Sequence, residues 1–160
     1  MPGFITTYTE DGVKVTLHDG IRHSEEPVGG TGMSRRYHPN GTIHAEVPLE
    51  KGMTHGTVRT WHDNGKLASQ AQHVYGTIRG ITRSWDADGS LAAELNYVLT
   101  EAVYGRTYAD AGRVHSTYLW NGKPMSKARW TKKVLAIGLT QEELNERLAR
   151  FDQVPPSGSA

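Results

Sequence analysis

Four arginines occupy the same place in four copies of one short motif, and they are the residues here best suited to binding chemistry. Each lies two positions before an aromatic residue, as in RRYHPNGTI and RTWHDNGKL. The arginines are Arg35, Arg59, Arg83 and Arg106, and the aromatics are Tyr37, Trp61, Trp85 and Tyr108. A guanidinium pairs with carboxylates or phosphates through parallel hydrogen bonds, and aromatic rings dominate interface energy. The alternative role is structural, with each arginine stacked on its aromatic at the edge of the core.

The motif recurs at a nearly fixed period. Its corner glycines are Gly41, Gly65, Gly89 and Gly112, at spacings of 24, 24 and 23 residues. A second turn signal lies between corners, in GMTHG and GTIRG, so each period holds two short strands. Helical repeats need about 33 residues or more. We therefore predict a mainly β fold in which each repeat is an antiparallel hairpin.

The corner residues decide which side chains share a face of the sheet. In RRYHPNGTI, proline fixes φ at the first loop position and glycine takes the left-handed one, which favours a three-residue loop. That loop gives four aromatic–aliphatic pairs, Tyr37–Ile43, Trp61–Leu67, Trp85–Leu91 and Tyr108–Val114.

Counting onward by twos extends the two faces. The arginines join the aromatic face opposite small residues, namely Ala45, Ser69, Ala93 and Ser116. The other face is mostly polar and includes Glu46, Gln70 and Glu94. Five apolar residues extend the aromatic face, namely Val47, Leu95, Tyr97, Tyr118 and Trp120. We therefore expect open space above each guanidinium.

Helical signals replace the strand pattern after residue 125. Residues 126–137 read as one helix, and 140–151 as a second in which Thr140 and Glu143 form a capping box. Leu144, Leu148 and Phe151 form the apolar stripe of the second helix. We predict one domain over residues 1–151, with hairpin repeats at about 4–125, one or two helices within 126–151, and a disordered tail at 152–160.

Composition argues against several functional classes. The 18 Lys+Arg residues balance 17 Asp+Glu, whereas a nucleic-acid-binding protein usually carries a basic excess. The absence of cysteine excludes disulfides, thiolate zinc sites and thiol catalysis. No apolar run reaches 18 residues, and the first residues lack the pattern of a signal peptide. We expect a cytoplasmic protein that does not insert stably into membranes.

Motifs for catalysis and metal binding are missing from the sequence. Of the eight histidines, His38 and His62 hold equivalent corner positions, which two strand spacings place about 10 Å apart. A single metal ion needs its ligands at about 2.0–2.2 Å. Nothing in the sequence places the carboxylate pairs Asp86/Asp88 and Glu25/Glu26 in a pocket or beside a nucleophile, and no phosphate loop or cofactor fingerprint occurs. We predict no catalytic residue, no metal site and no cofactor, and hence a protein that is not an enzyme.

The Tyr-x-x-Asn-Gly-x-Ile run, the period near 24 residues and the Gly-x-x-x-Gly joint resemble the MORN-repeat-variant proteins, in particular the YwqK-like antitoxin and immunity family. The resemblance covers residues 33–120, with 8–15 as a degenerate first copy. It implies one elongated, single-layer, twisted sheet of stacked hairpins. The chain departs from the pattern in the 29-residue interval before its first good copy and in Ala111, which replaces Asn or Asp.

For part of that family the resemblance implies an antitoxin or immunity role. We therefore expect a non-catalytic protein that neutralises a co-encoded toxin or effector by direct binding through the aromatic and arginine face. A repeat sheet has few elements to cover its apolar face, and exposed apolar area marks a partner. The alternatives are a membrane-surface or scaffold module and, further off, a small enzyme with its site at the junction of sheet and helices.

Overall fold

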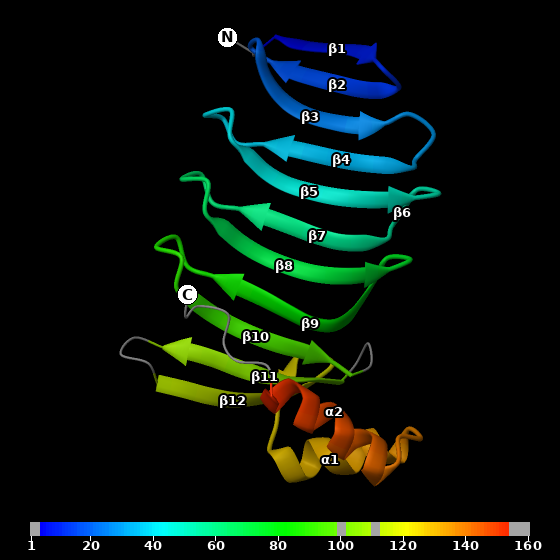
Figure 1. The fold of residues 1–160 in the computed structure, drawn as a ribbon, viewed down its shortest axis with the longest axis vertical. Helices are drawn as coiled ribbons and strands as arrows, with labels where there is room; N and C mark the ends of the chain where they lie inside the picture. The colour runs from blue at the N-terminus through cyan, green and yellow to red at the C-terminus, as the bar shows by residue number, and fades with distance from the viewer. Residues whose placement is uncertain (1–3, 99–101, 110–112, 154–160) are drawn as a thin grey trace.

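The structure, a computed structural model, describes residues 4–98, 102–109 and 113–153. In these ranges thirteen antiparallel strands form one open sheet, and consecutive strands are neighbours except that β5 pairs with both β6 and β7. Figure 1 shows an elongated, twisted ladder with two helices at its C-terminal end. The predicted fold class is confirmed.

The strands are β1 Ile5–Glu10, β2 Val13–His18, β3 Ile21–Pro27, β4 Gly32–Tyr37, β5 Ile43–Glu50, β6 Met53–Thr54, β7 Gly56–Trp61, β8 Leu67–Val74, β9 Thr77–Trp85, β10 Leu91–Tyr97, β11 Ala102–Ala109, β12 Arg113–Trp120 and β13 Lys123–Pro124. The helices are α1 Lys127–Ala136 and α2 Gln141–Gln153. Of the tail expected at 152–160, two residues therefore belong to α2, and 154–160 lie outside the described residues.

The three-residue corner loop is confirmed. In the first corner the amide of His38 donates to the carbonyl of Thr42 (2.8 Å), the amide of Gly41 donates back to His38 (2.9 Å), and Gly41 has φ 85°. The second and third corners repeat these bonds. The loop of the fourth corner, including Ala111 and Gly112, lies outside the described residues. All four predicted pairs are present, Tyr37–Ile43, Trp61–Leu67, Trp85–Leu91 and Tyr108–Val114.

The degenerate first copy closes differently. Asp11 and Gly12 both have positive φ and form a two-residue turn, so Tyr8 pairs with Val15. The same short turn, which suits the right-handed twist of a hairpin, recurs at Lys51–Gly52 and Tyr75–Gly76. These two turns connect repeats and alternate with the corners along the chain.

A β-bulge follows each of the first three corners and overturns part of the predicted facing. Tyr37 pairs with Ile43, but Arg36 pairs with Ala45, so His44 is the extra residue of the bulge and has no partner directly opposite on β4. Ala68 and Ala92 are the extra residues of the next two bulges. One extra residue moves everything beyond it to the other face of a strand.

The bulges make three predicted partners wrong. Arg35, Arg59 and Arg83 face Glu46, Gln70 and Glu94, rather than Ala45, Ser69 and Ala93. These partners lie on the aromatic face, which corrects their assignment to the polar one. Val47, Leu95 and Tyr97, which were predicted on the aromatic face, lie on the opposite face. The pairing between β11 and β12 has no bulge, so Arg106 faces Ser116, and Tyr118 and Trp120 stay on the aromatic face, as predicted.

Successive corners are hydrogen-bonded to each other. His38 donates from Nε2 to the carbonyl of Trp61 (2.9 Å), and His62 donates likewise to Trp85 (2.9 Å). The amide nitrogens of Asn40 and Asn64 reach the carbonyls of Asp63 (2.9 Å) and Ala87 (2.7 Å). The two corner histidines therefore act as spacers between neighbouring hairpins.

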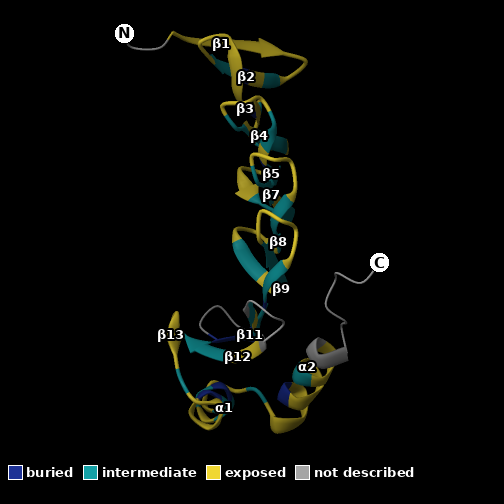
Figure 2. Cartoon of the chain, turned by 90° about the vertical axis from the view of Figure 1, so that its left-hand side faces the viewer, coloured by how far each residue is buried: buried dark blue, intermediate teal, exposed yellow. Residues whose placement is uncertain are grey.

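The main apolar core lies at the C-terminal end of the aromatic face. Trp130 and Val134 of α1 and Leu144 of α2 pack there on Val98, Ala102 and Tyr104. The indole of Trp130 also donates to the carbonyl of Leu119 (2.9 Å). From β1 to β9, by contrast, three side chains are buried, those of Val15, Glu25 and Ala45 (Figure 2).

Both helices begin as predicted. Ser126 caps α1 and accepts from the amide of Arg129. The capping box of α2 is present, with the Glu143 amide donating to Thr140 Oγ1 (3.2 Å) and the Thr140 amide donating to Glu143 Oε2 (2.9 Å). Leu144 is buried and Leu148 packs against the core, while the side chain of Phe151 lies outside the described part. Neither described helix combines the length and the apolarity needed to cross a membrane.

The corner bonds can be tested at Asn64, whose Oδ1 accepts from the Lys66 amide (3.0 Å) while its Nδ2 donates to the next corner. We expect Asn64→Asp, which keeps the acceptor but loses the donor, to lower the free energy of unfolding by about 1 kcal/mol. Asn64→Ala loses both bonds and should cost about twice as much. Urea unfolding measures both values. An unchanged free energy of unfolding in Asn64→Asp would show that the bond between corners contributes nothing.

Candidate functional site

The bulges align one row of side chains across the aromatic face. Directly opposed residues on strands β3 to β12 are Glu25, Arg35, Glu46, Arg59, Gln70, Arg83, Glu94, Arg106 and Ser116. Neighbouring strands lie about 4.8 Å apart, so arginines alternate with acceptor side chains at that spacing. We call this set the Arg/Glu row. It brings the four predicted arginines onto one line, each between two acceptor positions.

Arg35 is held between two glutamates. Its Nε lies 3.0 Å from Glu46 Oε1, and its Nη1 lies 3.4 Å from Glu25 Oε2. The hydrogen bond to Glu46 is the main cause that raises the pKa of Arg35. Arg22 also pairs with Glu25. The charge of Arg35 is therefore paired within the chain.

Arg83, farther along the row, pairs with one glutamate. Its Nε donates to Glu94 Oε1 (2.8 Å), and Tyr108 donates from its hydroxyl to Glu94 Oε2 (2.9 Å). Glu94 is 1% exposed, so its carboxylate depends on these donors. Burial, followed by the bond to Glu94, raises the pKa of Tyr108. Burial, followed by the nearby Glu25, raises the pKa of Tyr37.

Arg59 differs from Arg35 and Arg83. It is exposed and makes neither an ion pair nor a hydrogen bond with any described residue. The neighbour of Arg59 on β5 is Glu46, whose Oε1 already accepts from Arg35. Its neighbour on β8 is Gln70, which carries no charge. The structural role predicted for the arginines is thus present at Arg35 and Arg83, whereas the described residues give Arg59 no such role.

The four aromatics lie beside the corners, where all are half-buried. The helices cover the aromatic face at its C-terminal end, where Trp130 meets Tyr104 and Tyr118 at ring distances of 5.5 and 5.6 Å. Neither Trp61 nor Trp85 belongs to the described set of side chains packed on that core. We call the remaining part, which carries Tyr37, Arg59, Trp61, Gln70 and Trp85, the open face.

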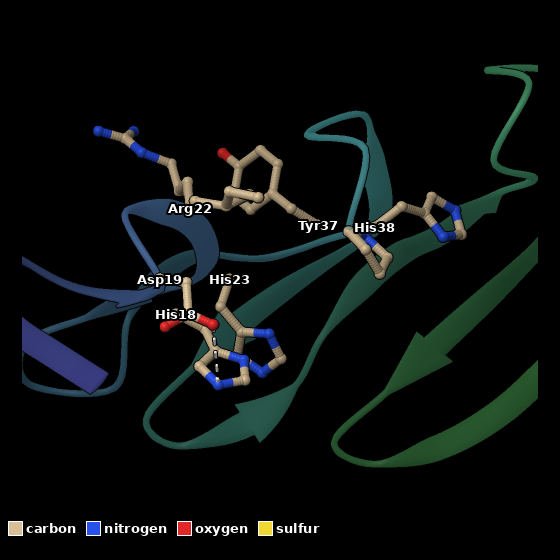
Figure 3. Close-up of a pocket in the computed structure, with 8 residues that line it drawn as sticks. His18, Asp19, Arg22, His23, Tyr37 and His38 are labelled. Carbon is tan, nitrogen blue, oxygen red and sulfur yellow. Dashed lines mark ion pairs between the residues drawn. The ribbon is translucent and has the colours of Figure 1, made fainter. Parts of the chain in front are cut away.

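A pocket of about 270 Å³ lies where the β2–β3 turn adjoins the first corner (Figure 3). His18, Asp19, Arg22, His23, Tyr37 and His38 line it. The ring of His38 points away from the other histidines and bonds to Trp61. In the described ranges, no three His, Asp or Glu side chains lie close enough together to hold a metal ion.

Sequence reasoning missed the acceptors of the row. Alternation places Glu46, Gln70 and Glu94 on the polar face, because a strand without a bulge flips sides at every residue. One signal was present. These three residues lie 24 apart, in phase with the aromatics. The pocket was missed because the β2–β3 turn lies outside the repeated motif.

A matched pair of variants separates the arginines by stability. We expect Arg83→Ala to lower the free energy of unfolding by about 2 kcal/mol, because it strips the buried Glu94 of a cation. Arg59→Ala should change it by less than about 0.5 kcal/mol, because this exposed side chain has no partner among the described residues. Urea unfolding of the two variants measures this. Similar losses in both would contradict the distinction.

Glu25 should make stability depend on acid pH. Burial alone would raise the pKa of Glu25, but bonds from Tyr37, Arg22 and Arg35 outweigh it and lower the pKa below its ordinary 4.5. The unfolded chain thus binds this proton more readily than the folded one. The carboxylate therefore stabilises the fold above pH 4.5, and that contribution is lost as pH falls through the lowered pKa.

We expect Glu25→Gln to lower the free energy of unfolding at neutral pH by about 1 kcal/mol. It should also flatten the decline in stability between about pH 5 and pH 3. Chemical unfolding across that pH range, with Glu26→Gln as the control for general charge effects, measures both. If the stability of Glu25→Gln fell as steeply with pH as that of the unchanged protein, Glu25 would not be the cause of the decline.

Comparison with known proteins supports the repeat assignment. Residues 54–75 match the MORN repeat variant family (MORN_2), and they span β7, the second corner and β8. A search of curated proteins finds no match. One solved structure, titled "Crystal structure of GtfA/B complex bound to UDP and GlcNAc", matches at 12% identity and a TM-score of 0.29, over 86% of this chain and 27% of that chain. A TM-score this low carries no argument. Residues 54–75 therefore form a MORN-type repeat, and the other hairpins follow its pattern.

Proposed function

We propose that this protein is a non-catalytic immunity or antitoxin protein, which neutralises a co-encoded toxin or effector by binding it on the open face. The observation that carries the proposal is this face itself. Two half-buried tryptophans, Trp61 and Trp85, flank the unpaired cation of Arg59, with no described element packed over them. Tryptophan and arginine are the residue types most enriched at the energetic centres of protein interfaces.

The rigidity of the sheet supports the same role. The open face is held by the corner bonds on one side and by the ion pairs of the row through its middle. A surface that is ordered before it binds loses little conformational entropy on binding, which favours affinity. The match to a repeat module also fits a binding role better than a catalytic one.

The charge pattern does not favour a membrane-surface role. Binding to anionic lipid needs a basic face, whereas the Arg/Glu row sets Glu25, Glu46 and Glu94 among its arginines. A protein partner, which can present groups of either sign, fits an alternating row.

Co-expression with the product of the adjacent gene tests the proposal, scored by growth. We expect the unchanged protein to rescue growth and Trp61→Ala to lose rescue, with affinity reduced at least about tenfold. The matched control is Val58→Ala, which removes a half-buried side chain from the opposite face of β7. Circular dichroism confirms that both variants fold. Rescue by Trp61→Ala, or its loss in Val58→Ala alone, would exclude the open face.

A further inference from the structure

One repeat position of the Arg/Glu row changes its chemistry in the middle of the sheet. Glu46, Gln70 and Glu94 hold this position, 24 residues apart, and each lies between two arginines. The first and third are glutamates, whereas the central one is a neutral glutamine. Between Arg59 and Arg83, therefore, the row lacks the negative charge that it places between every other described pair of arginines.

The two arginines at this gap have donors to spare. Arg59 is exposed and has no ion pair or hydrogen bond within the described part of the chain. Arg83 spends its Nε on Glu94, and its two Nη groups have no hydrogen-bond partner among the described residues. Gln70 lies between the two arginines, as Glu46 and Glu94 lie between the other pairs, but its uncharged side chain balances neither cation. The gap in charge over Gln70 thus has spare donors for one carboxylate.

The flanking aromatics make an anion here effective. Trp61 and Trp85 lie two residues beyond the two arginines on the same face, and both are half-buried. A partner that covers them excludes water from the gap, and a charge-assisted hydrogen bond strengthens as the local dielectric falls. Closing the face over Arg59 without an anion would instead bury an unpaired charge, which is costly.

We propose that the gap over Gln70 receives an aspartate or glutamate side chain of the protein partner. That carboxylate takes the place of the missing repeat glutamate and pairs with Arg59 and with the free Nη groups of Arg83. The inference rests on the proposed function, because it names the group that the open face recognises. The partner's matching surface is thus an acidic residue set among apolar ones.

A probe of defined chemistry tests the gap without the partner. Phenylacetate combines a carboxylate with a ring, and its uncharged counterpart is phenylacetamide. In the isotope-labelled protein we expect phenylacetate, at millimolar concentration, to shift the Nε–Hε resonances of Arg59 and Arg83 saturably, and phenylacetamide to leave them unchanged. Equal effects of the two would overturn the proposal. Phenyl phosphate binding more than tenfold tighter at the same arginines would overturn the choice of a carboxylate.

Gln70→Glu fills the gap from within and is the decisive variant. We expect it to weaken phenylacetate binding and partner affinity at least tenfold, while its melting temperature stays the same or rises. Gln141→Glu, the same charge change on α2, is the matched control and should alter neither affinity. Arg59→Gln, at an exposed position, should give a similar tenfold loss if Gln70→Glu does not fold.

The outcomes distinguish the two proposals. Partner affinity that survives both Gln70→Glu and Arg59→Gln but falls in Trp61→Ala would overturn the carboxylate and leave the open face as the binding site. Partner affinity that survives Trp61→Ala as well, with phenylacetate still bound at the gap, would overturn the proposed function and leave an anion site.

Discussion

Lateral pairing between neighbouring strands is the interaction on which this structure depends. From β1 to β9 the sheet has no second described layer, and three buried side chains cannot supply the apolar burial that stabilises an ordinary domain. Cross-strand pairs contribute about 0.2–1 kcal/mol each, so many must act together. The Arg/Glu row provides such pairs through the middle of the sheet. The corner bonds join neighbouring hairpins along the side where the corners lie.

Under the proposed function, the row lets one surface serve as both scaffold and binding face. Arg35 and Arg83 donate hydrogen bonds to glutamates of the same chain, whereas Arg59 donates none to the described residues. Glutamates flank Arg35 on both sides, whereas the neutral Gln70 between Arg59 and Arg83 leaves positive charge at the centre of the row. The C-terminal helices cover the aromatic face beside β11 and β12, so this positive charge lies where the sheet is open. Under the proposed function, stability and recognition thus use the same residue type at different repeats.

Local chemistry made much of the fold predictable. The pairing of Tyr37 with Ile43 follows from Pro39 and Gly41, and the start of α2 follows from Thr140 and Glu143, since each signal lies within a few residues of its effect. The bulges have no such signal. Their extra residues, His44, Ala68 and Ala92, have no turn-forming chemistry, and the register shift that they cause depends on pairing across strands. The arginines were therefore found and their acceptors misplaced.

The bonds between corners make this architecture divisible into equal units. Donor and acceptor sit at matching positions of the first three corners, so a 24-residue unit between them can be duplicated or removed without changing the chemistry of these junctions. Each added unit lengthens the sheet by two strands, about 10 Å, and brings one more arginine and one more acceptor position. The number of copies would determine the length of the sheet. The choice of glutamate or glutamine in each copy would determine the pattern of charges along the row. Length and charge pattern can thus change independently, one by duplication and the other by a single substitution.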